Sequence, residues 1–464
     1  MSKGCIICGL RARSGEHVFP AALGGRRTNK GIYCGAHNNG FSPLAAILSN
    51  QLTAINAFLG VRPDHSDEPR QLTTINPSNG EAYLVSALKV ELVSPRLVQG
   101  VTVDGIRKMQ MQFSNEHQFQ QWLAEQRAAG LKIETSRGPE GRAYFTQPFH
   151  VRIDFGGPEG LKAIGYIALT FLGHYFPQIA RQAELTEFKK FVLGESKEQP
   201  VWWDFNALPS VIPPNAFRFG HRILIGVSAL RQEAYARVSL FSTLDFSVLF
   251  GSLRIETDET IIVDIDPQAD SAPGDIYEKR EQDALATVER PASLHSSLND
   301  TINSGEARNR FDILLQNIFN WQLECMAKTL LPKIEVTNSL SSFDRNRQVK
   351  QLLSDHGQLI LNQIFFVVNG LKQQFRTDPT TAALVPVLDV LLAEDTTSAT
   401  GLSQNSTFAL ELATIALADQ VCLDHESGKL DWQRLSLLLG GGLGAQIAGK
   451  AVLQPFMMAL GITQ

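Results

Sequence analysis

Residues 5–38 read CIICGLRARSGEHVFPAALGGRRTNKGIYCGAHN. The stretch opens with a Cys-x2-Cys pair, Cys5 and Cys8, and closes with Cys34 and His37 at the same spacing. Two such pairs suit a tetrahedral zinc ion, because each pair folds as a tight knuckle around one metal. We therefore predict a structural zinc site, which would supply folding energy to a segment too short for its own core. The alternative is that the four residues lie close in sequence by chance.

The segment between the two pairs is longer than a small zinc finger needs, which predicts a further role for it. Glu16 and Asn38 offer hard oxygen donors, which suit Mg²⁺ or Mn²⁺ better than zinc. His17 follows Glu16, and a neutral imidazole can take a proton from an attacking water at physiological pH. A lone histidine is more often structural than catalytic, but the adjacent carboxylate and the flanking metal ligands favour catalysis here.

Basic residues are concentrated at the start of the chain. Seven Lys and Arg residues accompany a single acid in residues 1–62, whereas the whole chain has a net charge of −5. Phosphate contacts supply most non-specific affinity for nucleic acid. We therefore expect this part of the chain to meet a polyanionic backbone, and Arg26, Arg27 and Lys30 could supply phosphate contacts. The alternative is a chance accumulation of charge in a short window.

The periodicity of residues 1–62, which we call the head, predicts a strand, a loop, a strand and a helix. Residues 43–59 have apolar side chains at three- and four-residue spacing, as an amphipathic helix requires, with Asn38 near its start. The polar, proline-containing segment 60–70 follows. It predicts a domain boundary near residue 62.

The rest of the chain predicts an α+β protein. Residues 63–275 mix short alternating apolar runs with helical segments, without regular alternation of strand and helix, so we expect an α+β domain around an antiparallel sheet. Residues 276–464 show helical periodicity. The expected organisation is a head at 1–62, an α+β domain of unknown role at 63–275 and a mostly helical domain at 276–464.

Two patterns in the middle of the chain favour structural over binding roles. Asp264, Asp266 and Asp270 lack the glycine and the distal glutamate of an EF-hand loop, so we expect an outward acidic strand face. The pair Trp202-Trp203 could stack on a nucleic-acid base, but such a cluster is more often part of a core.

Composition indicates a globular protein of two or three domains, with 464 residues of which 44% are hydrophobic and 19% charged. Cys325 and Cys422 are isolated, which indicates a reducing compartment rather than a disulfide framework. No apolar signal segment precedes Cys5, so we expect a cytoplasmic protein. Residues 435–462 are apolar but interrupted by polar residues and a proline. They predict a packed helical hairpin without stable membrane insertion, and weak membrane association is the alternative.

The order and spacing of the head residues resemble the HNH endonuclease family, in its version with two zinc knuckles. The resemblance rests on Glu16-His17 within EHVFP, the Gly-Gly turn, Asn29 five residues before Cys34, and the C-x2-H-Asn-Asn ending. It covers residues 5–45, a small part of the chain. The ββα-metal fold of that family implies an N-terminal, zinc-stabilised nuclease domain.

Carried over by position, the resemblance assigns a role to each polar residue. His17 matches the general base, and Glu16 occupies the place of the acidic metal ligand beside it. Asn29 matches the middle residue, which holds the loop and orients the histidine, and Asn38 matches the last, metal-binding residue. The implied mechanism is one-metal hydrolysis of a phosphodiester, with Mg²⁺ or Mn²⁺ as the catalytic ion.

Three positions depart from the family pattern. His37 stands where a fourth cysteine is usual, which still permits a Cys3His site. Glu16 replaces an aspartate, which lengthens the metal-ligand arm by one methylene. In the family, a basic residue often follows the last motif position, but here Asn39, Gly40 and Phe41 follow it. Phosphate contact is therefore left to basic residues between the two metal-ligand pairs.

These inferences predict a metal-dependent HNH-type endonuclease that hydrolyses DNA. A small nuclease head on a large body is common among bacterial anti-phage defence and restriction-type proteins, so we expect the body to sense or target. The sequence leaves open a partner protein or signal for the body, oligomerisation, and RNA as the substrate. The competing function is a non-enzymatic zinc module that binds nucleic acid or protein. It would need the zinc ligands but not Glu16, His17, Asn29 and Asn38 together.

Overall fold

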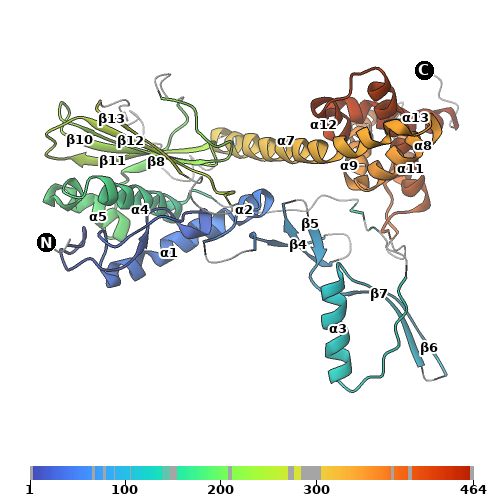
Figure 1. Cartoon of the computed structure of the whole chain (residues 1–464), viewed down its shortest axis with the longest axis horizontal. Coiled ribbons are helices and arrows are strands. Elements are labelled where there is room, and N and C mark those ends of the chain that lie inside the picture. Colours follow the sequence, from blue (N-terminus) through green and yellow to red (C-terminus); the bar gives the residue numbers. More distant parts are fainter. Residues whose placement is uncertain are drawn as a thin grey trace. The chain divides into compact units, whose positions relative to one another are not determined.

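The computed structural model divides into two compact units, whose elements Figure 1 labels. Unit 1 comprises Met1–Leu72, Val85–Lys89 and Val151–Ile318, and unit 2 comprises Thr73–Leu84, Val90–His150 and Phe319–Gln464. The structure describes residues 4–64, 68–76, 80–87, 89–104, 106–138, 142, 144–145, 153, 155–206, 212–269, 276–283, 305–377, 381–395 and 400–459.

Unit 1 begins with two short strands and two helices. Strand β1 (Glu16–His17) pairs antiparallel with β2 (Thr28–Asn29). A 3-10 helix, η1 (Ala21–Leu23), lies between them, and α1 (Gly35–Gln51) and α2 (Thr53–Leu59) follow. The head thus has the expected order of strand, loop, strand and helix.

Helix α1 begins earlier than the periodicity predicted. It starts at Gly35 rather than Pro43, and Pro43 lies inside it. The added turns contain two glycines and several polar residues, so they have no apolar stripe that a sequence pattern could detect. Their apolar contribution begins at Phe41, which is buried together with Leu44 and Leu48.

A six-stranded sheet of unit 1 has the strand order β13-β12-β9-β10-β11-β8. All of its pairings are antiparallel, which confirms the expected antiparallel sheet of an α+β protein. Strand β9 is buried along its whole length, as a central strand covered on both faces should be. The strands are β8 (Val201–Trp203), β9 (His221–Ser228), β10 (Glu233–Leu240), β11 (Leu244–Ser252), β12 (Glu259–Ile265) and β13 (Ile276–Glu281).

Helix α4 (Pro158–Tyr175) lies between the head and this sheet (Figure 1). It packs against α1 on one side and against β8, β9 and β10 on the other. Its middle turns are therefore buried all round, as expected of a helix with an apolar surface on every side. The 3-10 helices η2 (Ile179–Arg181) and η3 (Ala183–Leu185) and helix α5 (Thr186–Leu193) follow it.

The two sequence patterns of the middle segment both lie in this sheet. Trp203 is buried and packs on Phe246 with ring centroids 4.4 Å apart, as expected of a core residue. Asp264 is also fully buried, so the prediction of an outward acidic face was wrong for this residue. The reason is Arg222 on the paired strand, whose Nε donates to Asp264 Oδ1 at 2.6 Å. Asp270 lies outside the described residues.

Short strands follow the head. A three-stranded sheet and a separate hairpin precede helix α3, which Asn115 caps by accepting a hydrogen bond from the Gln118 amide. The elements are β3 (Leu72–Ile75), β4 (Ala82–Ser86), β5 (Lys89–Leu92), β6 (Arg96–Val103), β7 (Ile106–Gln112) and α3 (Glu116–Ala128).

The C-terminal region is helical, as predicted. Its core is aliphatic and includes the fully buried Ile360, Ile364 and Ala413. The helices are α7 (Gly305–Glu335), η4 (Val336–Ser339), α8 (Ser342–Ser354), α9 (Gly357–Thr377), η5 (Ala382–Leu384), α10 (Val385–Asp389), η6 (Val390–Leu392), α11 (Gln404–Glu426), α12 (Trp432–Gly440) and α13 (Gly442–Ala459).

One described helix, α11, is long and apolar enough to cross a membrane by length and composition. Half of its most apolar window is buried inside the protein, and a core helix passes the same test, so this is weak evidence of a membrane span. Helices α12 and α13 pass the test only as a pair bent by 49°. Both pack against α9, and α13 also packs against α11, which agrees with the expected packed hairpin.

The two units do not coincide with the three domains expected from the sequence. The head and the six-stranded sheet share unit 1, because α1 packs on α4 and the ring of Phe19 packs against that of His221 with centroids 4.8 Å apart. The segment 63–275 is divided between the units. These contacts join residues far apart in the sequence, which periodicity and turn signals do not reveal.

Candidate functional site

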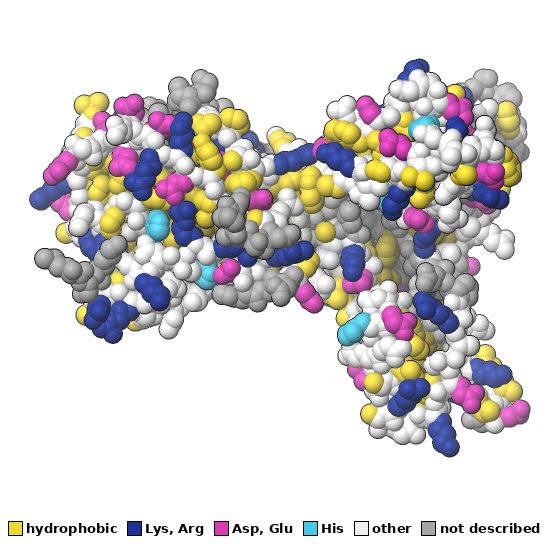
Figure 2. Space-filling view, viewed as in Figure 1, with side chains coloured by type: hydrophobic (Ala, Val, Ile, Leu, Met, Phe, Trp, Pro, Cys, Tyr) yellow, Lys and Arg dark blue, Asp and Glu magenta, His cyan; other side chains and the backbone are white. Residues whose placement is uncertain are grey.

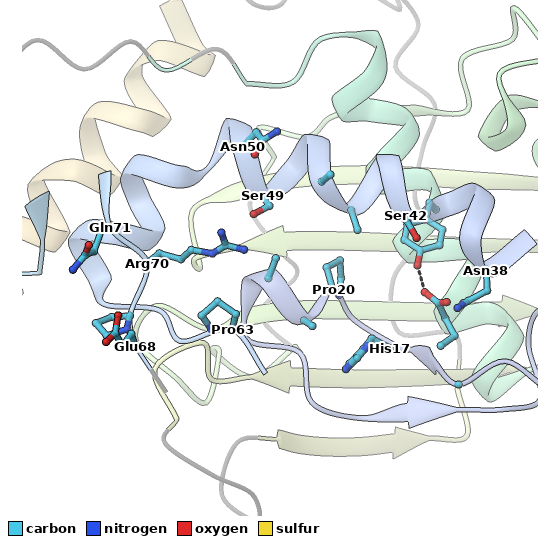
Figure 3. A pocket seen from close by; sticks show the side chains of 18 residues that line it. His17, Pro20, Asn38, Ser42, Ser49, Asn50, Pro63, Glu68, Arg70 and Gln71 are labelled. Carbon is cyan, nitrogen blue, oxygen red and sulfur yellow. Dashed lines mark hydrogen bonds between the residues drawn. The ribbon is translucent and has the colours of Figure 1, made fainter. Parts of the chain in front are cut away.

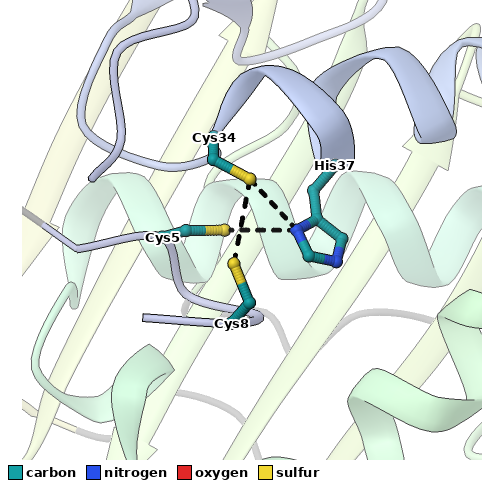
Figure 4. A group of neighbouring side chains, drawn as sticks. All are labelled: Cys5, Cys8, Cys34 and His37. Carbon is teal, nitrogen blue, oxygen red and sulfur yellow. Dashed lines mark hydrogen bonds between the residues drawn. The ribbon is translucent and has the colours of Figure 1, made fainter. Parts of the chain in front are cut away.

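Cys5, Cys8, Cys34 and His37 come together in a Cys3His cluster (Figure 4). The four ligand atoms lie within 4.8 Å of one another. Cys8 Sγ is 3.8 Å from Cys34 Sγ, and His37 Nδ1 is 3.2 Å from Cys34 Sγ. In a tetrahedral site with zinc–sulfur bonds of about 2.3 Å, two sulfurs lie ~3.8 Å apart. The cluster is therefore a site that could hold a structural metal such as zinc.

Backbone geometry shapes both halves of the cluster. The Gly9 amide donates to Cys5 O at 2.9 Å, and the positive φ of Gly9, 73°, turns the chain back after the first pair. Cys34 is the N-cap of α1, so His37 lies in the first turn of the helix. Hydrogen bonds from the His37 backbone and ring lower the pKa of the Cys34 thiol to about 6. This favours the thiolate that a metal requires.

Arg181 links the two halves from outside the head. Its Nη2 donates to Gly4 O at 2.6 Å and to Gly31 O at 3.0 Å. The guanidinium thereby holds the chain before Cys5 against the loop before Cys34. No sequence signal marks Arg181, because it follows α4 in the chain and belongs to no motif.

A pocket of about 760 Å³ lies along α1 (Figure 3). One face of α1 forms a wall, and the segment around β1, the residues after α2 and Tyr166 of α4 supply the rest. Glu16, His17 and Asn38 all line this pocket. The structure thus brings together three of the polar residues that the sequence singled out, and it places the fourth, Asn29, on the strand paired with β1.

Glu16 is buried in the pocket wall and is 7% exposed. The hydroxyl of Tyr166 donates a hydrogen bond to Glu16 Oε1, drawn dashed in Figure 3. Burial raises the pKa of Glu16 to about 7, although the hydrogen bond from Tyr166 acts in the opposite direction. The Glu16 carboxyl group is therefore partly protonated near neutral pH.

Asn38 contributes an unsatisfied oxygen. Its Oδ1 is buried and has no hydrogen-bond partner among the residues that the structure describes. A buried polar atom without a partner costs about 1–3 kcal/mol. A hard cation would satisfy it, because amide and carboxylate oxygens are the ligands that Mg²⁺ and Mn²⁺ prefer. Asn38 and Glu16 line one pocket.

Asp64, which no sequence pattern marks, holds His17. His17 Nε2 lies 3.0 Å from Asp64 Oδ2, and Asp64 Oδ1 lies 3.5 Å from Arg26 Nη1. Because a carboxylate only accepts, the proton of the neutral ring is assigned to Nε2 and the lone pair to Nδ1. Asp64 lies in the polar segment 60–70, where no spacing distinguishes it from its neighbours.

Asn29 contacts the loop after β2 and helix α4. Its Oδ1 accepts a hydrogen bond from the Gly31 amide at 2.7 Å, and its Nδ2 lies 2.7 Å from His174 Nδ1. The first contact holds the loop, as the resemblance implies. The ring that Asn29 contacts through Nδ2 is His174, whereas Asp64 holds His17. A catalytic role for Asn29 stays a prediction.

The three basic residues expected to contact nucleic acid have separate surroundings. Arg26 Nη2 donates to a backbone carbonyl at 2.8 Å. Arg27 Nη1 donates to Tyr175 Oη and Glu278 Oε2, both at 2.8 Å, and Lys30 is exposed. On the face that Figure 2 shows, Lys and Arg side chains are interspersed with Asp and Glu. Nucleic-acid contact by these three residues stays a prediction.

No family model matches the chain, and the comparisons with curated proteins and with solved structures find no similar protein. A Cys3His cluster also occurs in zinc proteins with no enzymatic activity. Function must therefore be argued from the chemistry of the pocket.

Proposed function

We propose that the chain is a metal-dependent endonuclease that hydrolyses DNA phosphodiester bonds, with Glu16, His17 and Asn38 in its active site. The observation that carries this proposal is the convergence of these three side chains on one pocket. Two oxygen donors for a hard cation and an imidazole held by a carboxylate are the groups that phosphodiester hydrolysis needs.

Glu16 and Asn38 would hold the catalytic cation. When bound, Mg²⁺ or Mn²⁺ supplies positive charge that stabilises the developing negative charge on the phosphate and on the leaving oxygen. Tyr166 orients the Glu16 carboxyl group through its hydrogen bond. The pKa of Glu16, about 7, makes proton loss from this group accessible at physiological pH.

His17 would act as the general base. Water attacks phosphorus, its proton passes to the His17 imidazole, and the bond between phosphorus and the 3′ oxygen breaks. Asp64 stabilises the resulting imidazolium, as the carboxylate does in other His–Asp pairs. The leaving oxygen takes a proton from solvent, so the products carry a 5′ phosphate and a 3′ hydroxyl.

The Cys3His cluster would act as a scaffold for this chemistry. Cys34 and His37 lie at the start of α1, directly before Asn38, and Cys5 and Cys8 precede β1 in the chain. A metal at the cluster ties the start of α1 to the segment that leads into β1. It thereby supports the placement of Asn38 in the same pocket as Glu16 and His17.

The competing zinc-binding module without activity needs the cluster alone. It gives no reason for Glu16, His17 and Asn38 to line one pocket, nor for Asp64 to hold His17. Side chains directed to separate surfaces would have favoured it. On architecture alone, we retain the proposal that the rest of the chain senses or targets, as in bacterial defence nucleases.

The test is nicking of supercoiled plasmid in Mg²⁺ or Mn²⁺ by the wild type, by His17→Ala and by His117→Ala, with EDTA as the blank. His117 is an exposed histidine of α3 and serves as the matched control. We expect His17→Ala to lower the nicking rate roughly 10²–10⁴-fold, because a positioned general base contributes about that factor. His117→Ala should nick like the wild type.

The zinc content of both variants should equal that of the wild type, since neither histidine belongs to the Cys3His cluster. Nicking by His17→Ala at the wild-type rate would refute the assignment of the base. Nicking that persists in EDTA would refute the role of the divalent cation.

A further inference from the structure

One end of the pocket has no task in the hydrolysis described above. Arg70 lines this end together with Ser49, Asn50 and Gln71. Figure 3 shows the Arg70 side chain extending toward the middle of the pocket. A backbone hydrogen bond of 3.0 Å from the Arg70 amide to Val61 O fixes the base of this side chain.

The guanidinium of Arg70 has no acceptor among the described residues, and its Nε is buried without a hydrogen-bond partner. Arg26 and Arg27, in contrast, each donate to acceptors of the protein itself. A guanidinium presents up to five donors in a rigid fork, and leaving buried donors unpaired is unfavourable. The Arg70 end of the pocket is therefore suited to an anion.

The wall between Arg70 and the proposed cation site is long and made of small side chains. At a rise of 1.5 Å per residue, the helix from Asn38 to Asn50 extends ~18 Å. One strand of B-form DNA has a phosphate about every 3.4 Å along the axis, so this length matches several consecutive phosphates. The lining residues of α1 are Asn38, Ser42, Ala45, Ala46, Ser49 and Asn50.

We propose that Arg70 is a second phosphate subsite, which binds a phosphate of the same DNA strand a few nucleotides from the bond that is cut. This inference rests on the proposed function. Arginine suits the task, because its planar fork can donate two hydrogen bonds to the non-bridging oxygens of one phosphate. Glu68, the other charged residue at this end, is exposed.

The test measures binding separately from chemistry. The His17→Ala protein is compared with His17→Ala proteins that also carry Arg70→Gln, Arg70→Lys or Arg13→Gln. Arg13 is an exposed arginine of the head outside the pocket lining, and it controls for the loss of one charge. The probes are a fluorescein-labelled single-stranded oligodeoxynucleotide and its duplex, titrated without added Mg²⁺ or Mn²⁺ at several salt concentrations.

We expect Arg70→Gln to weaken binding of the preferred probe about tenfold and to reduce the slope of log K against log[salt] by ~0.7–0.9, as for one lost phosphate contact. Arg70→Lys should restore the salt slope but not all of the affinity, since lysine provides charge without the fork. An equal effect of Arg70→Gln and Arg13→Gln would overturn the subsite, as would failure of His17→Ala to bind either probe.

The two proposals can fail separately. If the wild type nicks plasmid and Arg70→Gln binds both probes like its control, the nuclease assignment is supported and the phosphate subsite is refuted. If Arg70→Gln weakens binding selectively but the wild type never nicks plasmid, phosphate binding by Arg70 is supported and the nuclease assignment is refuted.

Discussion

Glu16 is a buried carboxyl group that would have to be charged to bind the proposed cation. Its carboxyl lies beneath Tyr166 and is 7% exposed, and burial raises its pKa to about 7. A carboxylate that binds a cation must be charged, whereas the apolar surroundings favour the neutral acid. The cation is the group that would resolve this conflict, because its charge would compensate the carboxylate and also satisfy Asn38 Oδ1.

The stability of the protein without Mg²⁺ or Mn²⁺ should therefore depend on pH through Glu16. The pKa of Glu16 is about 7 in the folded state and 4.5 in the reference state. Its contribution is thus fully present below pH 4.5 and lost as the pH rises through 7. The free energy of unfolding should fall by roughly 3 kcal/mol at most over this pH range. Urea unfolding at pH values from 5 to 8 should show this decline in the wild type.

Glu16→Gln should lack this decline, because its amide does not titrate. Glu68→Gln serves as the matched control and should keep it, since Glu68 is an exposed residue of the same pocket. Other titrating groups act equally in all three proteins, so they cancel in the comparison. A parallel decline in the wild type and Glu16→Gln would contradict the buried carboxyl.

Residue types and spacing singled out the four residues that form the Cys3His cluster and three residues that line one pocket, but not the residues that contact them. Tyr166 lies in an apolar helix, where a tyrosine is indistinguishable from a core residue. Asp64 and Arg70 lie in a polar segment without periodicity. Tyr166 and Asp64 act through contacts with residues distant in the chain, and a single sequence contains no signal for such contacts.

Helix α1 joins the two sites of the head. Its N-terminal turn supplies His37 of the cluster and then Asn38 of the pocket, and its later turns line the pocket toward Arg70. Two glycines in its first turns and the internal Pro43 weaken it, because glycine costs backbone entropy and proline removes a hydrogen bond. We infer that the start of α1 depends on the metal cluster.

Removal of one thiolate tests this dependence. Cys8 is the exposed cysteine of the cluster, so Cys8→Ser changes core packing little. We expect Cys8→Ser to lose bound zinc on dialysis, to unfold at lower urea concentration and to show less helix by circular dichroism. Cys422→Ser, at a cysteine outside the cluster, should keep its zinc. Unchanged metal content in Cys8→Ser, measured by atomic absorption, would argue against the site.

At the scale of the whole molecule, the head is packed into unit 1 rather than attached to it. Tyr33 is fully buried, and its hydroxyl lies 3.0 Å from Thr170 Oγ1 of α4. Phe19 packs against His221, and burial lowers the pKa of His221 to about 3. The sequence placed a boundary near residue 62 from polarity and proline content. Those features indicate that α2 ends there, but they contain no information on what covers the apolar faces before it.

A fragment of residues 1–62 should therefore fail to fold, even with zinc. In the whole chain, Tyr33, Phe41, Leu48 and Leu52 are at most 2% exposed. Without α4 and the sheet, much of this apolar surface would contact water, and each large side chain would forfeit about 1.5–3 kcal/mol. Zinc binding would have to compensate for this loss as well as order the head.

Heteronuclear NMR of the zinc-titrated fragment is the measurement, with the full chain as reference for zinc stoichiometry and circular dichroism for helix content. We expect poor dispersion and little helix in the fragment. A well-dispersed spectrum at one zinc per fragment would show instead that the cluster alone suffices to fold the head. In that case α4 would serve the pocket only through Tyr166, and Glu16 in the fragment would titrate as an exposed carboxyl group does.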